Sequence, residues 1–376
     1  MAVICLWLMV AALAVNLPVT WWLIGAGRRW GQLDQPGDAA SHKQHGRSVP
    51  STGGIGIFLT LAVPLLIALV AVHLFPLDAF TGWLAPLRAH VPGLRAHSAM
   101  GFAILAAMLA LHIMGLIDDR RRLGPYSKLL VQVIVAAVLA SVFDLRVLHL
   151  LDAYGALGTV ASIAISVIWI VTIINAINFL DNMDGLAAGV SAVIAAIYLA
   201  ATLIGGQWFV AALAAMLLGA LAAFLVFNFP PAKIFMGDSG SLVVGLLLAV
   251  ISVRTTYFAP QASDLSAGVG EQGHWYGLLM PLIIMAVPLY DITSVTLIRL
   301  SQGRSPFYPD NQHFSHRLVK KGLSKRTAVI VIWLCTLATG LGGVMLGRLE
   351  GWQAALVAGQ TIAVLAVLAL LERTKA

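Results

Sequence analysis

The chain alternates between long apolar runs and short polar stretches. A helix needs about 20 apolar residues to cross a bilayer, and eleven runs approach that length. They cover 3–24, 53–74, 98–117, 128–147, 157–179, 185–204, 208–227, 239–256, 276–298, 327–346 and 352–372. The pattern therefore predicts an all-α, polytopic integral membrane protein with about 11 transmembrane helices.

Composition supports the same fold class. Hydrophobic residues make up 60% of the chain and charged residues 10%, whereas soluble domains carry about 25% charged residues. The net charge of +7 resides in short connections between runs, so it does not indicate a nucleic-acid partner. Cys5 and Cys335 fall inside apolar runs, which favours small packing residues over a disulfide or a metal site.

The distribution of basic residues predicts an orientation. Connections after odd-numbered runs, together with the C-terminus, hold 18 Lys and Arg residues, and the opposite side holds 5. The positive-inside rule then predicts an uncleaved first span with the N-terminus outside and the C-terminus in the cytoplasm. Residues 1–376 form one predicted membrane domain without repeats. Its cytoplasmic loops are expected at 25–52, 118–127, 180–185, 228–238 and 299–326.

Aspartates gather on the predicted cytoplasmic side. A charged side chain at the centre of a membrane helix costs about 2.5–3.5 kcal/mol on insertion scales, and less near the interface. The acids of this group are Asp118, Asp119, Asp181, Asp184, Asp238 and Asp310. A site at this surface would serve a water-soluble substrate and a lipid headgroup together.

The first two motifs lie at the ends of runs three and five. Asp118 and Asp119 are adjacent carboxylates, which raise each other's pKa unless a cation such as Lys128 intervenes. The alternative is a solvated helix end. In the second motif, Asn175, Asn178 and Asp181 share one helix face, and such oxygen ligands suit Mg²⁺. Here the alternative is an ordinary helix cap.

Two further motifs carry phosphate-binding chemistry. Asp238 stands among glycines that let backbone N–H groups approach a phosphate, and Phe235 either stacks on a base or anchors the membrane surface. In the last loop, His313, His316 and Arg317 can neutralise a diphosphate. A zinc pair and a plain basic loop are the alternatives for these residues.

These motifs resemble a known family, the polyprenyl-phosphate N-acetylhexosamine-1-phosphate transferases (glycosyltransferase family 4). The resemblance runs from about Asp34 to Gly322 and rests on four stretches in this order: GLIDD, NAINFLDNMDGL, NFPPAKIFMGDSGS and DNQHFSH. The first and last loops favour the N-acetylglucosamine branch over the phospho-N-acetylmuramoyl-pentapeptide branch. The departures are His42 where Arg is usual, Asn182 where Gly is usual and Ser315 where His is usual.

The resemblance implies a reaction: UDP-N-acetylglucosamine and undecaprenyl phosphate give undecaprenyl-diphospho-N-acetylglucosamine and UMP. It implies Mg²⁺ as cofactor, with Mn²⁺ as a substitute, and a site at the cytoplasmic face of a bacterial inner membrane. This step would initiate a cell-envelope polysaccharide such as O-antigen; a homodimer is left open.

The same resemblance implies roles for individual residues. Asp238, Asn178 and Asp181 would hold Mg²⁺, and Asp118 or Asp119 would act as base or position the lipid phosphate. The expected substrate-binding residues are Asn175, Asp184, Phe235, His313, His316, Arg317, Lys43 and Lys128. Direct attack is expected, and a phospho-aspartyl intermediate is the alternative. A transporter is the rival from another class, but it would carry polar groups near the middle of the membrane and often repeats.

Overall fold

The computed structural model describes residues 2–31, 33–34, 48–255, 275–307, 310 and 312–373. The long helices are α1 Ala2–Arg29, α2 Gly53–Leu74, α4 Ser98–Arg120, α5 Pro125–Ser141, α6 Gly155–Leu180, α7 Leu186–Ile204, α8 Trp208–Asn228, α9 Asp238–Thr255, α11 Ala286–Ser301, α13 Lys325–Gly343 and α14 Gly351–Arg373. The short helices are α3 Val91–Ala96, α10 Met280–Ile284 and α12 Phe314–Lys320. Two two-residue strands, β1 Leu33–Asp34 and β2 Val49–Pro50, pair antiparallel.

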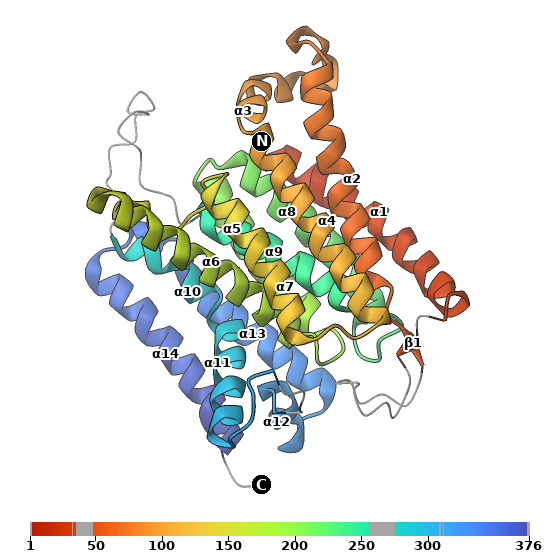
Figure 1. Ribbon diagram of the computed structural model, residues 1–376, viewed down its shortest axis with the longest axis vertical. Coiled ribbons are helices and arrows are strands. Elements are labelled where there is room, and N and C mark those ends of the chain that lie inside the picture. The colour runs from red at the N-terminus through yellow and green to blue at the C-terminus, as the bar shows by residue number, and fades with distance from the viewer. Residues whose placement is uncertain are drawn as a thin grey trace.

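The predicted all-α, polytopic fold is confirmed (Figure 1). Over the described ranges, nine helices are long and apolar enough to cross a membrane, and a tenth crossing is counted if the bent pair α10–α11 forms one span. The remaining predicted run corresponds to α5, which is apolar but has 17 residues. Which end of the bundle faces the cytoplasm stays a prediction.

Two predicted spans differ in shape from expectation. The predicted run 276–298 is broken at Met285, and α10 and α11 meet at 65°. Pro288 explains the break, because it lacks the N–H that would bond the carbonyl four residues earlier and its ring crowds that carbonyl. The predicted run 128–147 ends as a helix at Ser141. The chain then turns through Asp144 and Arg146 at the far end of the bundle.

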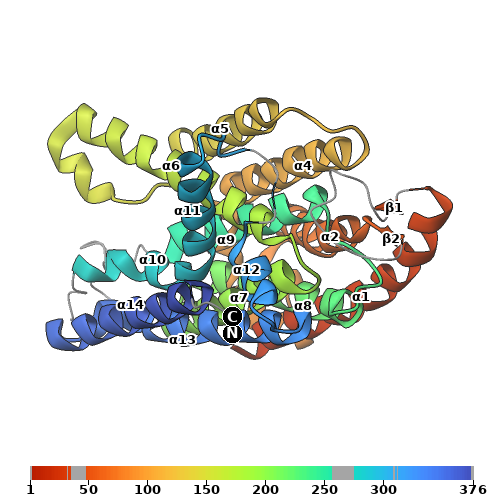
Figure 2. The same ribbon diagram turned by 90° about the horizontal axis from the view of Figure 1, so that it is seen from below.

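Helix α9 forms the centre of the bundle, as Figure 2 shows from below. In its apolar 18-residue stretch 89% of the residues are buried, whereas the value is 17% for the corresponding stretches of α1 and α14 at the periphery. Glycines permit the close packing at its first turn. A Cβ at Gly54 of α2 would collide with the backbone of Gly240, and one at Gly115 of α4 with that of Ser239. Three helices therefore converge where α9 begins.

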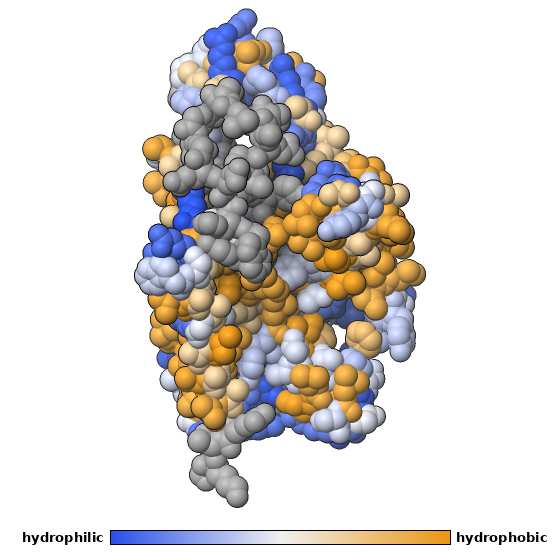
Figure 3. Space-filling model, turned by 90° about the vertical axis from the view of Figure 1, so that its left-hand side faces the viewer, coloured by the Kyte–Doolittle hydropathy of each residue, from blue (hydrophilic) through white to orange (hydrophobic). Residues whose placement is uncertain are grey.

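The outer helices present apolar side chains outward, as expected for a protein in a bilayer. Apolar residues cover much of the middle of the molecule in Figure 3. Among the most exposed large apolar side chains are Leu157 at 84%, Trp21 at 69% and Trp7 at 67%. Partly buried charged side chains gather at one end of the bundle, and these define the candidate site.

Candidate active site

Three aspartates and one lysine meet where α4 ends, α5 begins and α9 begins. The Lys128 ammonium lies 2.9 Å from Asp118 Oδ2 and 2.8 Å from Asp238 Oδ2. Its Nζ is thus shared by carboxylates that are 120 positions apart in the chain. Asp118 also accepts a hydrogen bond from the Leu123 backbone N–H at 2.7 Å, which closes the turn between α4 and α5. The structure thus brings Asp118, Lys128 and Asp238 together, and their roles stay a prediction.

Asp119 has a different role from its neighbour. Its carboxylate accepts hydrogen bonds from the backbone N–H groups of Asp238 at 2.8 Å and Ser239 at 3.2 Å. These are unpaired donors of the first turn of α9, and an anion is favourable at the positive end of a helix. Gly237, with φ +68°, lets the chain turn there; a Cβ would lie 2.7 Å from Asp119 Oδ2. Asp119 therefore fixes α9, and Asp118 is the carboxylate paired with lysine.

The predicted face of α6 joins the cluster through one residue. Asn178 Nδ2 donates to Asp238 Oδ1 and to Ser241 Oγ, both at 2.9 Å. Asn175 lies one turn deeper and donates to Gln132 Oε1 of α5 at 2.5 Å. Asn178 thus contacts the central carboxylate, while Asn175 supports the helix pair α5–α6.

The loop after α6 contacts the loop before α9. Asp181 ends α6, where its N–H donates to the Asn178 carbonyl at 3.1 Å. Asp184 Oδ2 accepts the backbone N–H of Ala232 at 3.0 Å. Both aspartates therefore lie at the same end of the bundle as Asp238, and Asp184 supports the 228–238 loop.

Protein ligands for a metal are few. Over the ranges described, no group of three or more His, Cys, Asp or Glu side chains could hold a metal ion, so the zinc alternative has no third ligand there. Mg²⁺ differs, because it binds through one or two carboxylates plus substrate phosphates and water. Asp118 and Asp238 already converge on one cationic atom, Lys128 Nζ. The donor set therefore fits Mg²⁺ in the presence of a phosphate substrate.

The sequence interpretation missed the partner of His313. Asp291, in α11, is fully buried; it lies 2.8 Å from His313 Nδ1 and accepts the Phe314 backbone N–H at 3.0 Å. A buried carboxylate at Nδ1 fixes the orientation of the imidazole and leaves Nε2 for a ligand. The available signal was a lone carboxylate inside an apolar run, a costly placement without a partner.

The basic loop is less cationic than its composition predicts. Burial, with the nearby charge of His313 and Lys320, lowers the pKa of His316 to about 4, so this imidazole is neutral at pH 7. Arg317 Nη2 donates to Ser294 Oγ at 2.9 Å and pairs with Glu372 of α14 at 3.0 Å. A diphosphate would therefore meet a neutral imidazole and an arginine that already has a partner.

A second arginine of this region organises the preceding loop. Arg299 is 3% exposed, and its guanidinium bonds both oxygens of Asp310 at 3.2 and 2.9 Å. Burial opposes ionisation of Asp310, but the hydrogen bonds and charge of Arg299 lower its pKa. Asp310 is therefore a structural anion of the loop.

Phe235 and Lys43 are two further residues that the sequence predicts to bind substrate. Phe235 is 2% exposed, so in this conformation its ring is not available to stack on a base, and the expectation of stacking is corrected. Its backbone N–H and C=O instead bond Pro50 and Gly53, tying the loop to α2. Lys43 and His42 lie outside the described residues.

Fold and site together define a class: polytopic membrane proteins with an acidic, lysine-bridged site at one end of the helix bundle. Residues 101–256, which include the Asp118, Asn178 and Asp238 motifs, match the family model described as glycosyl transferase family 4. Over that stretch the chain is similar to this family.

Several curated relatives carry specific names. The chain is 28% identical over 328 residues to a "Probable undecaprenyl-phosphate N-acetylglucosaminyl 1-phosphate transferase" of Bacillus subtilis, covering 86% of this chain and 79% of the relative. It is 35% identical over 165 residues to a "Decaprenyl-phosphate N-acetylglucosaminephosphotransferase" of Mycolicibacterium smegmatis, covering 43% and 39%. An "Undecaprenyl-phosphate alpha-N-acetylglucosaminyl 1-phosphate transferase" of Escherichia coli K12 is 32% identical over 113 residues, covering 30% and 27%.

Proposed function

We propose that the protein transfers N-acetylglucosamine 1-phosphate from UDP-N-acetylglucosamine to undecaprenyl phosphate, giving undecaprenyl-diphospho-N-acetylglucosamine and UMP. The names of its relatives support the sugar phosphate and the polyprenyl acceptor. The observation that carries the proposal is the lysine shared by Asp118 and Asp238 at the end of membrane-embedded helices. There a lipid phosphate and a soluble nucleotide can meet.

The chemical problem is that one anion must attack another. An oxygen of the lipid phosphate attacks the phosphorus next to the sugar, and the bond from that phosphorus to the bridging oxygen breaks, so that UMP leaves. Lys128 would reduce the repulsion and position the lipid phosphate. Asp238, Asn178 and Asp181 would hold Mg²⁺, which when bound would stabilise the charge of the leaving UMP. Mn²⁺ would suit the same oxygen donors.

A strong base is not required for this attack. The second pKa of a phosphate monoester is about 6, so most of the lipid phosphate is a dianion at pH 7. Asp118 would orient Lys128, and Asp119 would keep the first turn of α9 in place through its two backbone contacts. Release of UMP in a stoichiometric burst before any lipid acceptor is added would instead indicate a phospho-aspartyl intermediate.

The nucleotide would bind beside the loops that carry Asp184, His313, His316 and Arg317. Asp291 holds His313 through Nδ1, so that Nε2, when it carries a proton, can donate to a diphosphate oxygen. We place this site at the cytoplasmic face of a bacterial inner membrane, because the basic residues concentrate at that end.

The proposal is tested by UMP release from purified protein in detergent with undecaprenyl phosphate and Mg²⁺. UDP-N-acetylglucosamine and UDP-N-acetylmuramoyl-pentapeptide are compared as donors. We expect release with the first donor alone, and loss of release in Asp238→Ala. Release with the pentapeptide donor alone would reassign the substrate, and no release with either, in folded protein, would contradict the proposal.

A further inference from the structure

The loop after α6 is bonded to the first turn of α12. Ser315 Oγ donates to Asn182 Oδ1 at 2.8 Å, across 133 positions of the chain. Ser315 is fully buried and Asn182 is 3% exposed, so no water competes for this bond. The sequence interpretation treated both residues as separate departures from the family motifs, whereas the structure makes them partners.

Asn182 also binds the helix that precedes it. Its Nδ2 donates to the Phe179 carbonyl at 2.7 Å, one of the carbonyls left unpaired where α6 ends. The same side chain therefore joins the last turn of α6 to the first turn of α12. That turn of α6 carries Asn178 and precedes Asp181, and the turn of α12 lies between His313 and His316.

A second contact joins the same two turns. The ring of Phe179 meets the ring of His313 edge-on, with centroids 5.8 Å apart and planes at 89°. The Arg299 guanidinium lies 5.4 Å from the centroid of the Phe179 ring. The end of α6 is thus held against α12 by one buried hydrogen bond and by the packing of Phe179.

We propose that Asn182 and Ser315 are paired positioning residues that set the distance between the acidic end of α6 and the imidazoles of α12. The pair determines how tightly the site holds the diphosphate of the sugar nucleotide. This inference rests on the proposed function for the identity of that ligand. Neither side chain touches substrate, because both are buried and each is occupied by the other.

The test is a double-mutant cycle with Ser315→Ala, Asn182→Ala and the double variant, assayed for UMP release with saturating lipid acceptor. We expect each single variant to raise KM for UDP-N-acetylglucosamine about tenfold, with kcat within about threefold of the parent. The double variant should raise this KM by no more than about twentyfold, because the first substitution has already broken the hydrogen bond that the second would remove. Ser315→Thr keeps the hydroxyl, so its KM should be close to that of the parent rather than that of Ser315→Ala.

Ser166→Ala is the matched control, since Ser166 is a fully buried, hydrogen-bonded serine in the middle of α6, away from the end that carries Asn178. It should leave KM unchanged. Unchanged KM in Ser315→Ala and Asn182→Ala, with only a lower melting temperature, would overturn the proposal, as would effects that multiply in the double variant. If the parent protein transfers nothing, the proposed function fails by itself. In that case UDP is titrated into the same variants. A similar rise in the Kd for UDP in both single variants supports the positioning role of Asn182 and Ser315, and an unchanged Kd refutes it.

Discussion

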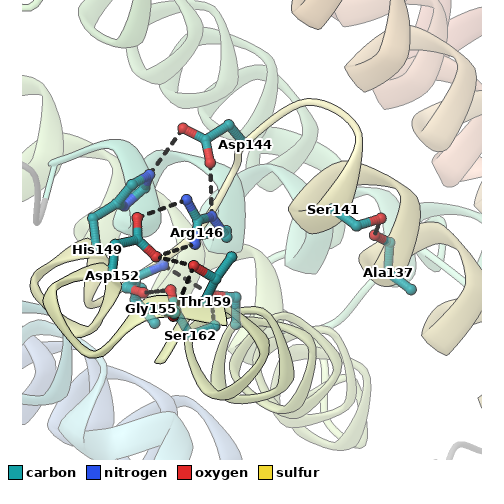
Figure 4. Close-up of polar contacts among 11 residues, drawn as sticks. Ala137, Ser141, Asp144, Arg146, His149, Asp152, Gly155, Thr159 and Ser162 are labelled. Carbon is teal, nitrogen blue, oxygen red and sulfur yellow. Dashed lines mark hydrogen bonds and ion pairs between the residues drawn. The ribbon is translucent and has the colours of Figure 1, made fainter. Parts of the chain in front are cut away.

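Two polar clusters lie at opposite ends of α5 and differ in their charge balance. The site cluster, near the start of the helix, consists of Asp118, Asp119, Lys128 and Asp238. The far-end cluster follows the end of the helix and consists of Asp144, Arg146, His149, Asp152 and Thr159 (Figure 4). Both join helices, but only one of them combines three carboxylates with a single lysine.

The far-end cluster is saturated by its own members. Arg146 bonds Asp144 at 2.7 Å and both oxygens of Asp152 at 3.0 and 3.1 Å. His149 contacts the other oxygen of Asp144 at 2.9 Å, and Thr159 donates to Asp152 at 2.7 Å. The hydrogen bonds that Arg146 donates to Asp152 and Asp144, against the effect of burial, raise the pKa of Arg146. Each carboxylate of this cluster therefore already has side-chain partners within the cluster, and the arrangement stabilises a turn.

The site cluster retains an excess of negative charge in its contacts. Lys128 neutralises part of the negative charge of Asp118 and Asp238. Asp119 contacts backbone N–H groups rather than a cation. Clustered carboxylates repel unless a cation joins them, so this arrangement favours binding of a further cation. The comparison separates an ion-pair cluster whose carboxylates are paired within it from the cluster that we propose as the active site.

The largest expected effect comes from removing the cation of the site cluster. Lys128→Gln should lower kcat for UMP release about 100-fold, because the phosphate loses its cationic partner while the carboxylates remain. The melting temperature should change little, since the lysine and both partners keep some contact with water. Transfer assays and thermal unfolding in detergent measure the two quantities. A variant with normal kcat would contradict the assigned role.

The equivalent change in the far-end cluster should have the opposite signature. Arg146→Gln leaves Asp144 and Asp152 without their shared partner, and breaking a buried ion pair costs about 3–5 kcal/mol. Because Asp144 and Asp152 are more exposed than that figure assumes, we expect a much smaller loss, seen as a modestly lower melting temperature. The activity of the folded fraction should match the parent. Loss of activity without loss of stability would mean that this cluster is not purely structural.

Glu372→Gln tests whether Arg317 is shared between protein and substrate. The carboxylate of Glu372 lies 3.0 Å from Arg317 and would compete with a diphosphate for the guanidinium. Removing its charge should lower KM for UDP-N-acetylglucosamine about threefold, because the neutral amide competes less strongly with a diphosphate for the guanidinium. Steady-state kinetics measure this change, with Tyr290→Phe, which removes the other hydrogen bond to Glu372, as the comparison. A higher KM would show that Glu372 instead positions Arg317.

The smallest effect concerns pH. Because the pKa of His316 is lowered to about 4, the unfolded chain binds a proton at this residue below about pH 6.5 that the folded protein does not. His316 therefore lowers stability as pH falls from about 6.5 to 4, and has no effect above that window. His316→Gln should flatten the pH dependence of the melting temperature there. An unchanged dependence would show that other groups account for it.

Some features followed from local sequence alone. The span pattern depends on the length and hydropathy of each segment, so α1, α2 and α4 were found near their predicted bounds. The acidic motifs were recognisable because charged and amide side chains gather at the ends of apolar runs on one side, where a charge costs less than at the centre of a membrane helix. Periodicity could not reveal the bend at Met285, although Pro288 marks its position.

The sequence by itself determined the fold class, the positions of the helices and the set of polar residues at one surface, because these depend on hydropathy and spacing along the chain. Tertiary structure alone decided which of them touch. It separated Asp118, paired with Lys128, from Asp119, which fixes α9. It also brought Asp291 to His313 and Asn182 to Ser315. The physical reason is that these contacts join residues on different helices, and only packing sets the distance between them.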